Sequence, residues 1–185
     1  MNISFIGGGN MASALISGLL QQGYAARQLN VVEINAGSRE KLQQAFGITA
    51  VADLAEGIAT SDVILLSVKP QQLFELTQKL VPLLKNQLTI SIAAGIRATD
   101  IMRWLGGYQR VVRAMPNTPS LVRSGVTGLY AAPSVDARDR TSAESILAAV
   151  GSTLWVDDEE MLHAVTAISG SGPAYVFYFI EAMQQ

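Results

Sequence analysis

Cysteine is absent from the 185-residue sequence, and histidine occurs only once. Without cysteine, the chain has no disulfide framework, no thiol redox chemistry and no thiolate to offer a metal. A single histidine also excludes a metal site built on a histidine cluster. The composition therefore predicts no metal centre, and any catalysis must use other groups.

An excess of charge and a long apolar run are also lacking. The formal net charge is only −2, and no basic stripe with interleaved aromatic residues is present, which argues against nucleic-acid binding. The longest apolar runs, residues 63–66 and 175–180, are too short to span a bilayer. Asn2 stands where a signal peptide would have basic residues, so we expect a cytoplasmic location and no membrane contact.

Apolar residues are plentiful, at 49% of the chain, which suits one domain and part of another. Short apolar runs alternate with stretches of helical period, and this alternation predicts an α/β fold with a doubly wound, mostly parallel sheet. We expect Thr99 to cap the helix that it begins. Strands are predicted at 2–6, 29–34, 48–51, 62–68, 88–92, 110–115, 125–131 and 153–156, and helices at 11–20, 38–46, 54–59, 72–84, 99–105 and 136–150.

A glycine-rich turn follows the first predicted strand and opens the first predicted helix. It has the G-x-G-x-x-A pattern of a dinucleotide-binding turn. Gly7 would allow the tight turn, Gly9 would let the backbone approach a pyrophosphate, and Ala12 would let the helix pack close to the strand. The free N–H groups of the helix start then attract phosphate. The turn is formed by Gly7, Gly8, Gly9, Asn10, Met11 and Ala12, after Ile6.

Glu33 lies about 20 residues beyond the turn, where a carboxylate can bind the adenosine ribose 2′-hydroxyl. The alternative is that Glu33 ends a strand in solvent. Asn35, Ser38 and Arg39 follow closely and could hydrogen-bond a 2′-phosphate, which Glu33 itself would repel. The sequence therefore leaves both NADH and NADPH open as cofactors.

Two strand ends are expected to border the cofactor. Ligands of open parallel sheets bind at the carboxyl ends of the strands, and the fourth predicted strand ends at Ser67, Val68, Lys69 and Pro70. Lys69 is either a contact to the ribose or pyrophosphate or an ordinary solvated lysine. The small residues 93–95 follow the next strand and leave room for a ring to approach the backbone.

A stiff segment, Pro116-Asn117-Thr118-Pro119, follows the predicted strand 110–115. Two prolines hold the amide and hydroxyl between them in one geometry. We expect Asn117 and Thr118 to lie beside the nicotinamide or the substrate, and the alternative is an asparagine bound to its own backbone.

The last 30 residues carry an acidic run, the histidine and an apolar helix. We interpret residues 157–160 as charges that complement a helix dipole in water, and His163 as a helix-surface or core residue. Residues 169–172 read as a loop capped into a helix, with Pro173 in its first turn. That helix is nearly all apolar, so it must be buried against another protomer or further helices.

Five motifs occur along the chain in this order: FIGGGNMASAL (5–15), SVKPQ (67–71), SIAAG (91–95), VRAMPNTP (112–119) and SGSGPAY (169–175). Together they resemble the pyrroline-5-carboxylate reductases, which make proline, and the resemblance covers essentially the whole chain. It implies a Rossmann-like domain (1–156) and the start of an all-helical dimerisation domain (157–185). It also implies hydride transfer from NADH or NADPH to the C=N carbon of 1-pyrroline-5-carboxylate, giving L-proline, in a homodimer or higher oligomer.

The resemblance also implies roles for individual residues. The serine-, proline-, glycine- and threonine-rich loop that holds the substrate carboxylate in family members is not found, so we expect a chain truncated in its second domain. The expected cofactor contacts are residues 6–12, Glu33, Asn35, Ser67, Val68, Lys69, Pro70 and Ala94. The residues expected at the reacting end are Asn117, Thr118 and Ser171. The expected substrate contacts are Ser169, Gly170, Ser171 and Gly172.

Two other functions remain as alternatives. A protonated imine accepts hydride readily, so the lack of a histidine or cysteine apparatus does not exclude an enzyme. A related hydroxyacid dehydrogenase would use a lysine in its second domain, and no lysine follows Lys85. A non-catalytic dinucleotide-sensing module would bind the cofactor without turning over any imine.

Overall fold

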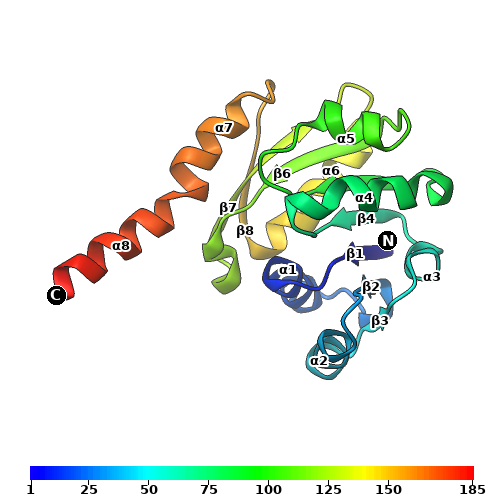
Figure 1. The fold of residues 1–185 in the computed structure, drawn as a ribbon, viewed down its shortest axis with the longest axis horizontal. Coiled ribbons are helices and arrows are strands. Elements are labelled where there is room, and N and C mark those ends of the chain that lie inside the picture. The colour runs from blue at the N-terminus through cyan, green and yellow to red at the C-terminus, as the bar shows by residue number, and fades with distance from the viewer.

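A computed structural model describes residues 1–185 and places eight strands in one sheet, with helices on both faces (Figure 1). The strands are β1 (Ile3–Ile6), β2 (Leu29–Val32), β3 (Thr49–Val51), β4 (Val63–Leu66), β5 (Leu88–Ser91), β6 (Val111–Met115), β7 (Gly125–Ala131) and β8 (Gly151–Trp155). Their order across the sheet is β3-β2-β1-β4-β5-β6-β7-β8, and only β6 and β7 pair antiparallel. The predicted doubly wound, mostly parallel α/β fold is confirmed.

The helices cover the sheet in two layers. They are α1 (Asn10–Gln21), α2 (Ala36–Phe46), α3 (Leu54–Ile58), α4 (Pro70–Leu80), α5 (Ala98–Trp104), α6 (Ala137–Leu147), α7 (Met161–Val165) and α8 (Gly172–Gln184). Phe5 points into the core beneath α1, α2 and α6, whereas its neighbour Ile6 points into the core beneath α3, α4 and α5. Because both faces of the central strands are buried, a ligand reaches the sheet only at the strand ends.

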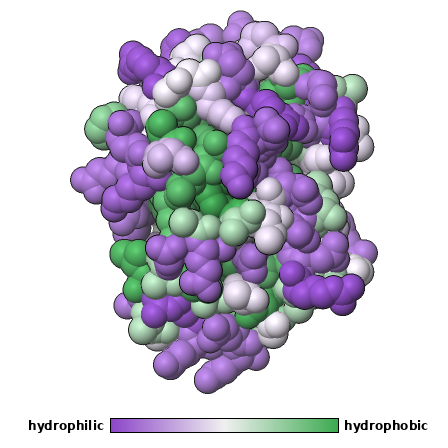
Figure 2. Space-filling view, turned by 90° about the vertical axis from the view of Figure 1, so that its right-hand side faces the viewer, coloured by the Kyte–Doolittle hydropathy of each residue, from purple (hydrophilic) through white to green (hydrophobic).

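The side that carries α3 is mostly hydrophilic, with hydrophobic residues gathered in a hollow near its middle (Figure 2). On the opposite side of the molecule, α7 and α8 extend away from the sheet (Figure 1). The aromatic side chains of α8 are therefore exposed in the single chain: Tyr175 is 62% exposed, Phe177 68% and Tyr178 77%. No helix combines the length and the apolar character that crossing a membrane requires.

Two local predictions near the ends of helices were wrong. Helix α5 begins at Ala98, one residue before Thr99, and Arg97 at its N-cap position makes no side-chain cap bond. Instead, the amide of Ala98 donates to Glu159 Oε1 at 2.7 Å. A carboxylate 61 residues away in sequence thus replaces the expected local cap, which sequence neighbours cannot reveal.

The segment 169–172 is helical and does not form the expected loop. Helix α7 continues through a π-helical turn, Thr166–Gly170, into α8. Ser171 donates its amide to Thr166 O at 2.8 Å, the five-residue spacing of a π turn, and its side chain forms no cap bond. Proline does occupy the first turn of α8, as expected.

Candidate functional site

A crevice of about 470 Å³ opens at the carboxyl ends of β1, β2 and β4. We call it the glycine crevice, because the turn between β1 and α1 forms one of its walls. It is lined by Ile6, Gly7, Gly8, Gly9, Val32, Glu33, Ile34, Ala52, Leu54, Ser67, Val68, Lys69, Gln72, Glu75, Leu76 and Lys79.

The glycines of the turn differ in what requires them. Gly7 has a φ of +99°, and a Cβ there would lie 2.8 Å from the carbonyl oxygen of Ser67. The Ser67 hydroxyl also donates to the carbonyls of Ile6 at 3.0 Å and Gly7 at 2.7 Å. Gly9 has ordinary extended backbone angles, and a Cβ there would meet no atom within 4 Å. The fold therefore requires Gly7, whereas Gly9 leaves open space beside the backbone.

The start of α1 has no partner for its positive end. The amides of Asn10, Met11 and Ala12 lack intrahelical acceptors, as the first N–H groups of any α-helix do. Gly9 provides no capping side chain, and no acidic residue lies in the first turn. This helix end therefore suits an anion such as a pyrophosphate.

The carboxylate of Glu33 is held against the glycine turn. Oε2 accepts a hydrogen bond from the Gly8 amide at 3.0 Å, and Oε1 accepts one from the Asn35 amide at 2.9 Å. The side chain of Asn35 caps α2 by accepting from the amide of Ser38 at 2.9 Å. Arg39 donates from Nη1 to the carbonyls of Glu33 and Ile34. Glu33 therefore brings a negative charge to the crevice, and Arg39, outside the lining, is held against the backbone of two lining residues.

Sequence reasoning located part of the lining and missed one helix face. The crevice takes in eight of the fourteen predicted cofactor residues and leaves out Asn10, Met11, Ala12, Asn35, Pro70 and Ala94. Ala12 is buried beneath the turn, and Ala94 is exposed in the turn after β5. The missed residues Gln72, Glu75, Leu76 and Lys79 lie on α4 at positions i, i+3, i+4 and i+7. That spacing marks one face of a helix and could have been found.

Asn117 lies outside this crevice and joins two distant segments. Its Nδ2 donates to Ser169 Oγ at 3.0 Å and Ser169 O at 3.3 Å, while Oδ1 accepts from the amide of Val126 at 3.0 Å. The side chain therefore bonds to residues of two other segments and not to its own backbone, and Asn117 is only 8% exposed. Thr118 is exposed beside it. The structure therefore brings residues of the 116–119 and 169–172 segments together.

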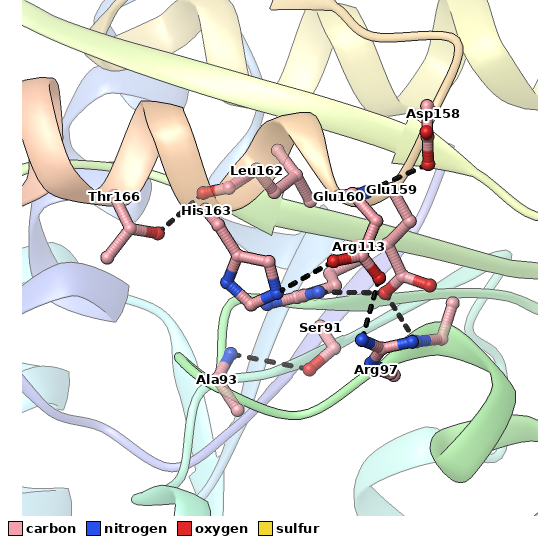
Figure 3. Close-up of polar contacts among 11 residues, drawn as sticks. Ser91, Ala93, Arg97, Arg113, Asp158, Glu159, Glu160, Leu162, His163 and Thr166 are labelled. Carbon is pink, nitrogen blue, oxygen red and sulfur yellow. Dashed lines mark hydrogen bonds and ion pairs between the residues drawn. The ribbon is translucent and has the colours of Figure 1, made fainter.

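The acidic run is less solvated than predicted. Glu159 accepts from Arg113 Nη1 at 2.8 Å, and the two side chains are only 13% and 3% exposed (Figure 3). His163 lies on the surface of α7, 56% exposed and 3.5 Å from Glu160, as one of the two interpretations expected. The interpretation of residues 157–160 as solvated charges is therefore wrong for Glu159.

A larger hollow, of about 680 Å³, lies at the amino ends of the strands, near Met1, Lys85 and Arg110. The Arg110 guanidinium binds both oxygens of Asp139, at 2.8 and 2.7 Å, and this bonding raises the pKa of Arg110. No glycine turn opens onto this hollow. Of the two hollows, only the glycine crevice combines open space beside the backbone, amides without acceptors and a carboxylate held in place.

Comparisons with known proteins identify the family to which the chain is similar. Residues 2–95 match the family described as NADP oxidoreductase coenzyme F420-dependent, and residues 159–185 match pyrroline-5-carboxylate reductase dimerisation. The pyrroline-5-carboxylate reductase of Pseudomonas aeruginosa is 50% identical over 182 residues, 98% of this chain and 67% of that protein. The enzyme of Pasteurella multocida is 45% identical and is covered over 68% of its length.

Solved structures show the same likeness. The pyrroline-5-carboxylate reductase of Coxiella burnetii superimposes with a TM-score of 0.94 at 42% identity, over 99% of this chain and 68% of that one. The pyrroline carboxylate reductase of Plasmodium falciparum, solved with NADP bound, gives 0.86 at 27% identity, over 98% and 67%. A prephenate dehydrogenase from A. aeolicus, at 18% identity, shares the fold alone with a TM-score of 0.76, over 98% and 68%.

Proposed function

This chain belongs to the pyrroline-5-carboxylate reductase family, and we propose that its nicotinamide cofactor binds in the glycine crevice. The family's reaction is the NAD(P)H-dependent reduction of 1-pyrroline-5-carboxylate to L-proline. The observation that carries the proposal is the open space at Gly9 beside the unpartnered amides of α1. A dinucleotide pyrophosphate can approach the backbone there and accept hydrogen bonds.

The residues of the crevice suit the other parts of a dinucleotide. The amides of Asn10 and Met11 would hold the pyrophosphate, and Glu33 would accept a hydrogen bond from the adenosine ribose. Val68 and Lys69 line the path from the glycine turn toward α4. We retain Ala12, Asn35, Pro70 and Ala94 as proposed contributors that support or border this path.

We propose that the reacting end lies beside the 116–119 and 169–172 segments. When bound, the nicotinamide supplies the hydride. The protein's task is to hold the imine carbon near it, because a protonated imine requires orientation more than a nucleophile. Asn117 would fix Ser169 through its amide, and Thr118 and Ser171 would approach the substrate. Gly172, where a Cβ would meet no atom within 4 Å, would leave room for the substrate, whereas Gly170 packs against Met115 and would border it.

We propose that residues 1–156 form the dinucleotide-binding unit. Residues 157–185 would then be the start of a dimerisation unit. The match of residues 159–185 to the family's dimerisation region supports a homo-oligomer. A homodimer would cover the exposed aromatic side chains of α8. A cytoplasmic location remains part of the proposal.

Self-association through α8 gives a direct prediction. Replacing Phe179, 65% exposed, by glutamate should shift the chain toward monomers, because a charge in an apolar interface is unfavourable. Light scattering over a range of concentrations measures the mass. The matched control Phe74→Glu places the same charge on the exposed surface of α4 and should leave the mass unchanged. A wild-type chain that stays monomeric at all concentrations would contradict the proposed interface.

The catalytic proposal is tested by following nicotinamide oxidation with 1-pyrroline-5-carboxylate as substrate. We expect the chain to oxidise the reduced cofactor only when the imine is present, and L-proline to accumulate in equal amount. Cofactor binding is measured in parallel by nicotinamide fluorescence. Tight binding with no turnover, also in a chain extended to the full length of its relatives, would instead favour a dinucleotide-sensing module.

A further inference from the structure

One oxygen of Glu159 joins three segments of the chain. Oε1 accepts hydrogen bonds from Arg113 Nη1 at 2.8 Å and from the amide of Ala98 at 2.7 Å. Figure 3 shows the bond between Arg113 and Glu159 beside the start of α7. Arg113 belongs to β6, Ala98 begins α5, and Glu159 precedes α7. We call these three residues the Glu159 junction.

The junction is buried, and its bonds are charge-assisted. The Arg113 side chain is only 3% exposed. Arg113 lies on a strand inside the sheet, where it pairs with Ser91 of β5 and with Tyr130 of β7. A guanidinium in such a place needs a fixed partner, since an unpaired buried charge is strongly unfavourable. Hydrogen bonds to an ionised group are also stronger than neutral ones. Glu159 therefore holds both partners more firmly than a neutral side chain would.

Two of the joined segments lead to the proposed reacting end. The turn 93–97 leads directly into Ala98, and this turn contains Ala94, a proposed cofactor neighbour. Helix α7 leads into the π turn, whose Ser169 is held by Asn117 just after β6. Both ends of the α7 segment are thus fixed to the β6 strand and the residues that follow it.

Close packing along α7 completes this attachment. Gly128 lies on β7, and a Cβ there would lie 2.9 Å from Val165 and 3.0 Å from Leu162. The missing side chain lets α7 lie directly on the strand. A shift at the Glu159 end of α7 would therefore be carried along a closely packed helix to Ser169.

We propose that Glu159 is a positioning residue for the reduction. With Arg113, it fixes the turn 93–97 on the cofactor side relative to the segment 169–172 on the substrate side. The assignment of the cofactor to one segment and of the substrate to the other rests on the proposed function. The juxtaposition itself rests on the hydrogen bonds to Arg113 and Ala98.

The neighbouring Glu160 provides a matched control. It forms an ion pair with Arg97 at 2.7 Å and faces His163 at 3.5 Å, but all three side chains are more than half exposed. Exposed ion pairs contribute little to stability. Replacing Glu160 by glutamine removes the same charge one residue away without touching the buried pair.

The first test compares Glu159→Gln with Glu160→Gln by amide hydrogen exchange. Loss of the charge should weaken the bond to Ala98 and speed its exchange by about tenfold, because charge-assisted bonds are roughly twice as strong as neutral ones. The amide of Ser171, bonded to Thr166, should exchange faster in the same variant. Equal exchange at both amides in the two variants would overturn the proposal.

The second test separates positioning from stability. In Glu159→Gln, kcat should fall by about 10-fold to 100-fold, as expected for a small misplacement, with little change in the Kd for NADH. A double variant, Arg113→Met with Glu159→Met, replaces the ion pair by apolar side chains and should remain folded. It should keep the low kcat, whereas full recovery of kcat would show that packing alone is required and would overturn the proposal. If the wild type reduces no imine, the proposed function fails, while the exchange comparison still decides the role of the junction.

Discussion

Replacing Gly9 by valine is expected to abolish cofactor binding while leaving the stability of the fold unchanged. The backbone at Gly9 has φ −72° and ψ −175°, angles that any residue adopts, and a Cβ there meets no atom within 4 Å. The valine methyl groups would instead fill the space that a pyrophosphate must enter. We expect the Kd for NADH to rise at least about 100-fold, or ~2.7 kcal/mol, typical of a steric overlap in a packed site.

Gly7→Ala is the control that distinguishes space for a ligand from space for the fold. Its φ of +99° and the 2.8 Å approach to Ser67 O mean that the alanine strains the backbone itself. The free energy of unfolding should fall by about 1–3 kcal/mol, measured by urea titration. Gly9→Val should unfold at the wild-type urea concentration. If Gly9→Val bound NADH as the wild type does, the pyrophosphate could not lie at the start of α1.

The second large effect is expected at Glu33, which we propose as the residue that distinguishes the two cofactors. Its carboxylate is anchored by the amides of Gly8 and Asn35, so it cannot swing away from a 2′-phosphate. Like charges brought together repel, and the wild type should therefore bind NADH more tightly than NADPH. In Glu33→Gln, the ratio of the Kd for NADPH to the Kd for NADH should fall about tenfold, or ~1.4 kcal/mol.

Arg39 is the counterpart to this prediction. Its guanidinium is anchored to the carbonyls of Glu33 and Ile34, so it brings a positive charge next to these two residues of the crevice lining. Arg39→Met should raise the same ratio by removing attraction for the 2′-phosphate. Fluorescence titration with both cofactors gives each Kd. An unchanged ratio in Glu33→Gln would show that the adenosine ribose does not face this carboxylate.

The sequence predicted the features that depend on neighbouring residues. The glycine turn, the carboxylate at the end of β2 and the alternation of strands and helices are all local patterns, and the structure places Gly7, Gly9 and Glu33 around one crevice. Parallel strands bring their carboxyl ends to one edge, so Ser67 and Val68 could also be placed there from sequence.

The features that sequence reasoning missed depend on distant contacts. The cap of α5 comes from Glu159, and the acidic run looked solvated because its partner Arg113 lies 46 residues away. The π turn depends on where α7 is fixed at each end, which no local signal gives. Asn117 was predicted to lie beside the reacting end, and its partners were not predicted: the bond from Val126 depends on the return of β7 beside β6, and the bond to Ser169 depends on where the π turn packs.

Amide chemical-shift mapping with NADH tests the central claim most directly, because it tells the two hollows apart. We predict that the largest shifts on addition of NADH occur at Gly8, Gly9, Asn10 and Met11, at the start of α1. Residues around the larger hollow, such as Asn86 and Arg110, should shift little. Large shifts around that hollow, with the glycine turn unchanged, would contradict the assignment of the cofactor to the glycine crevice.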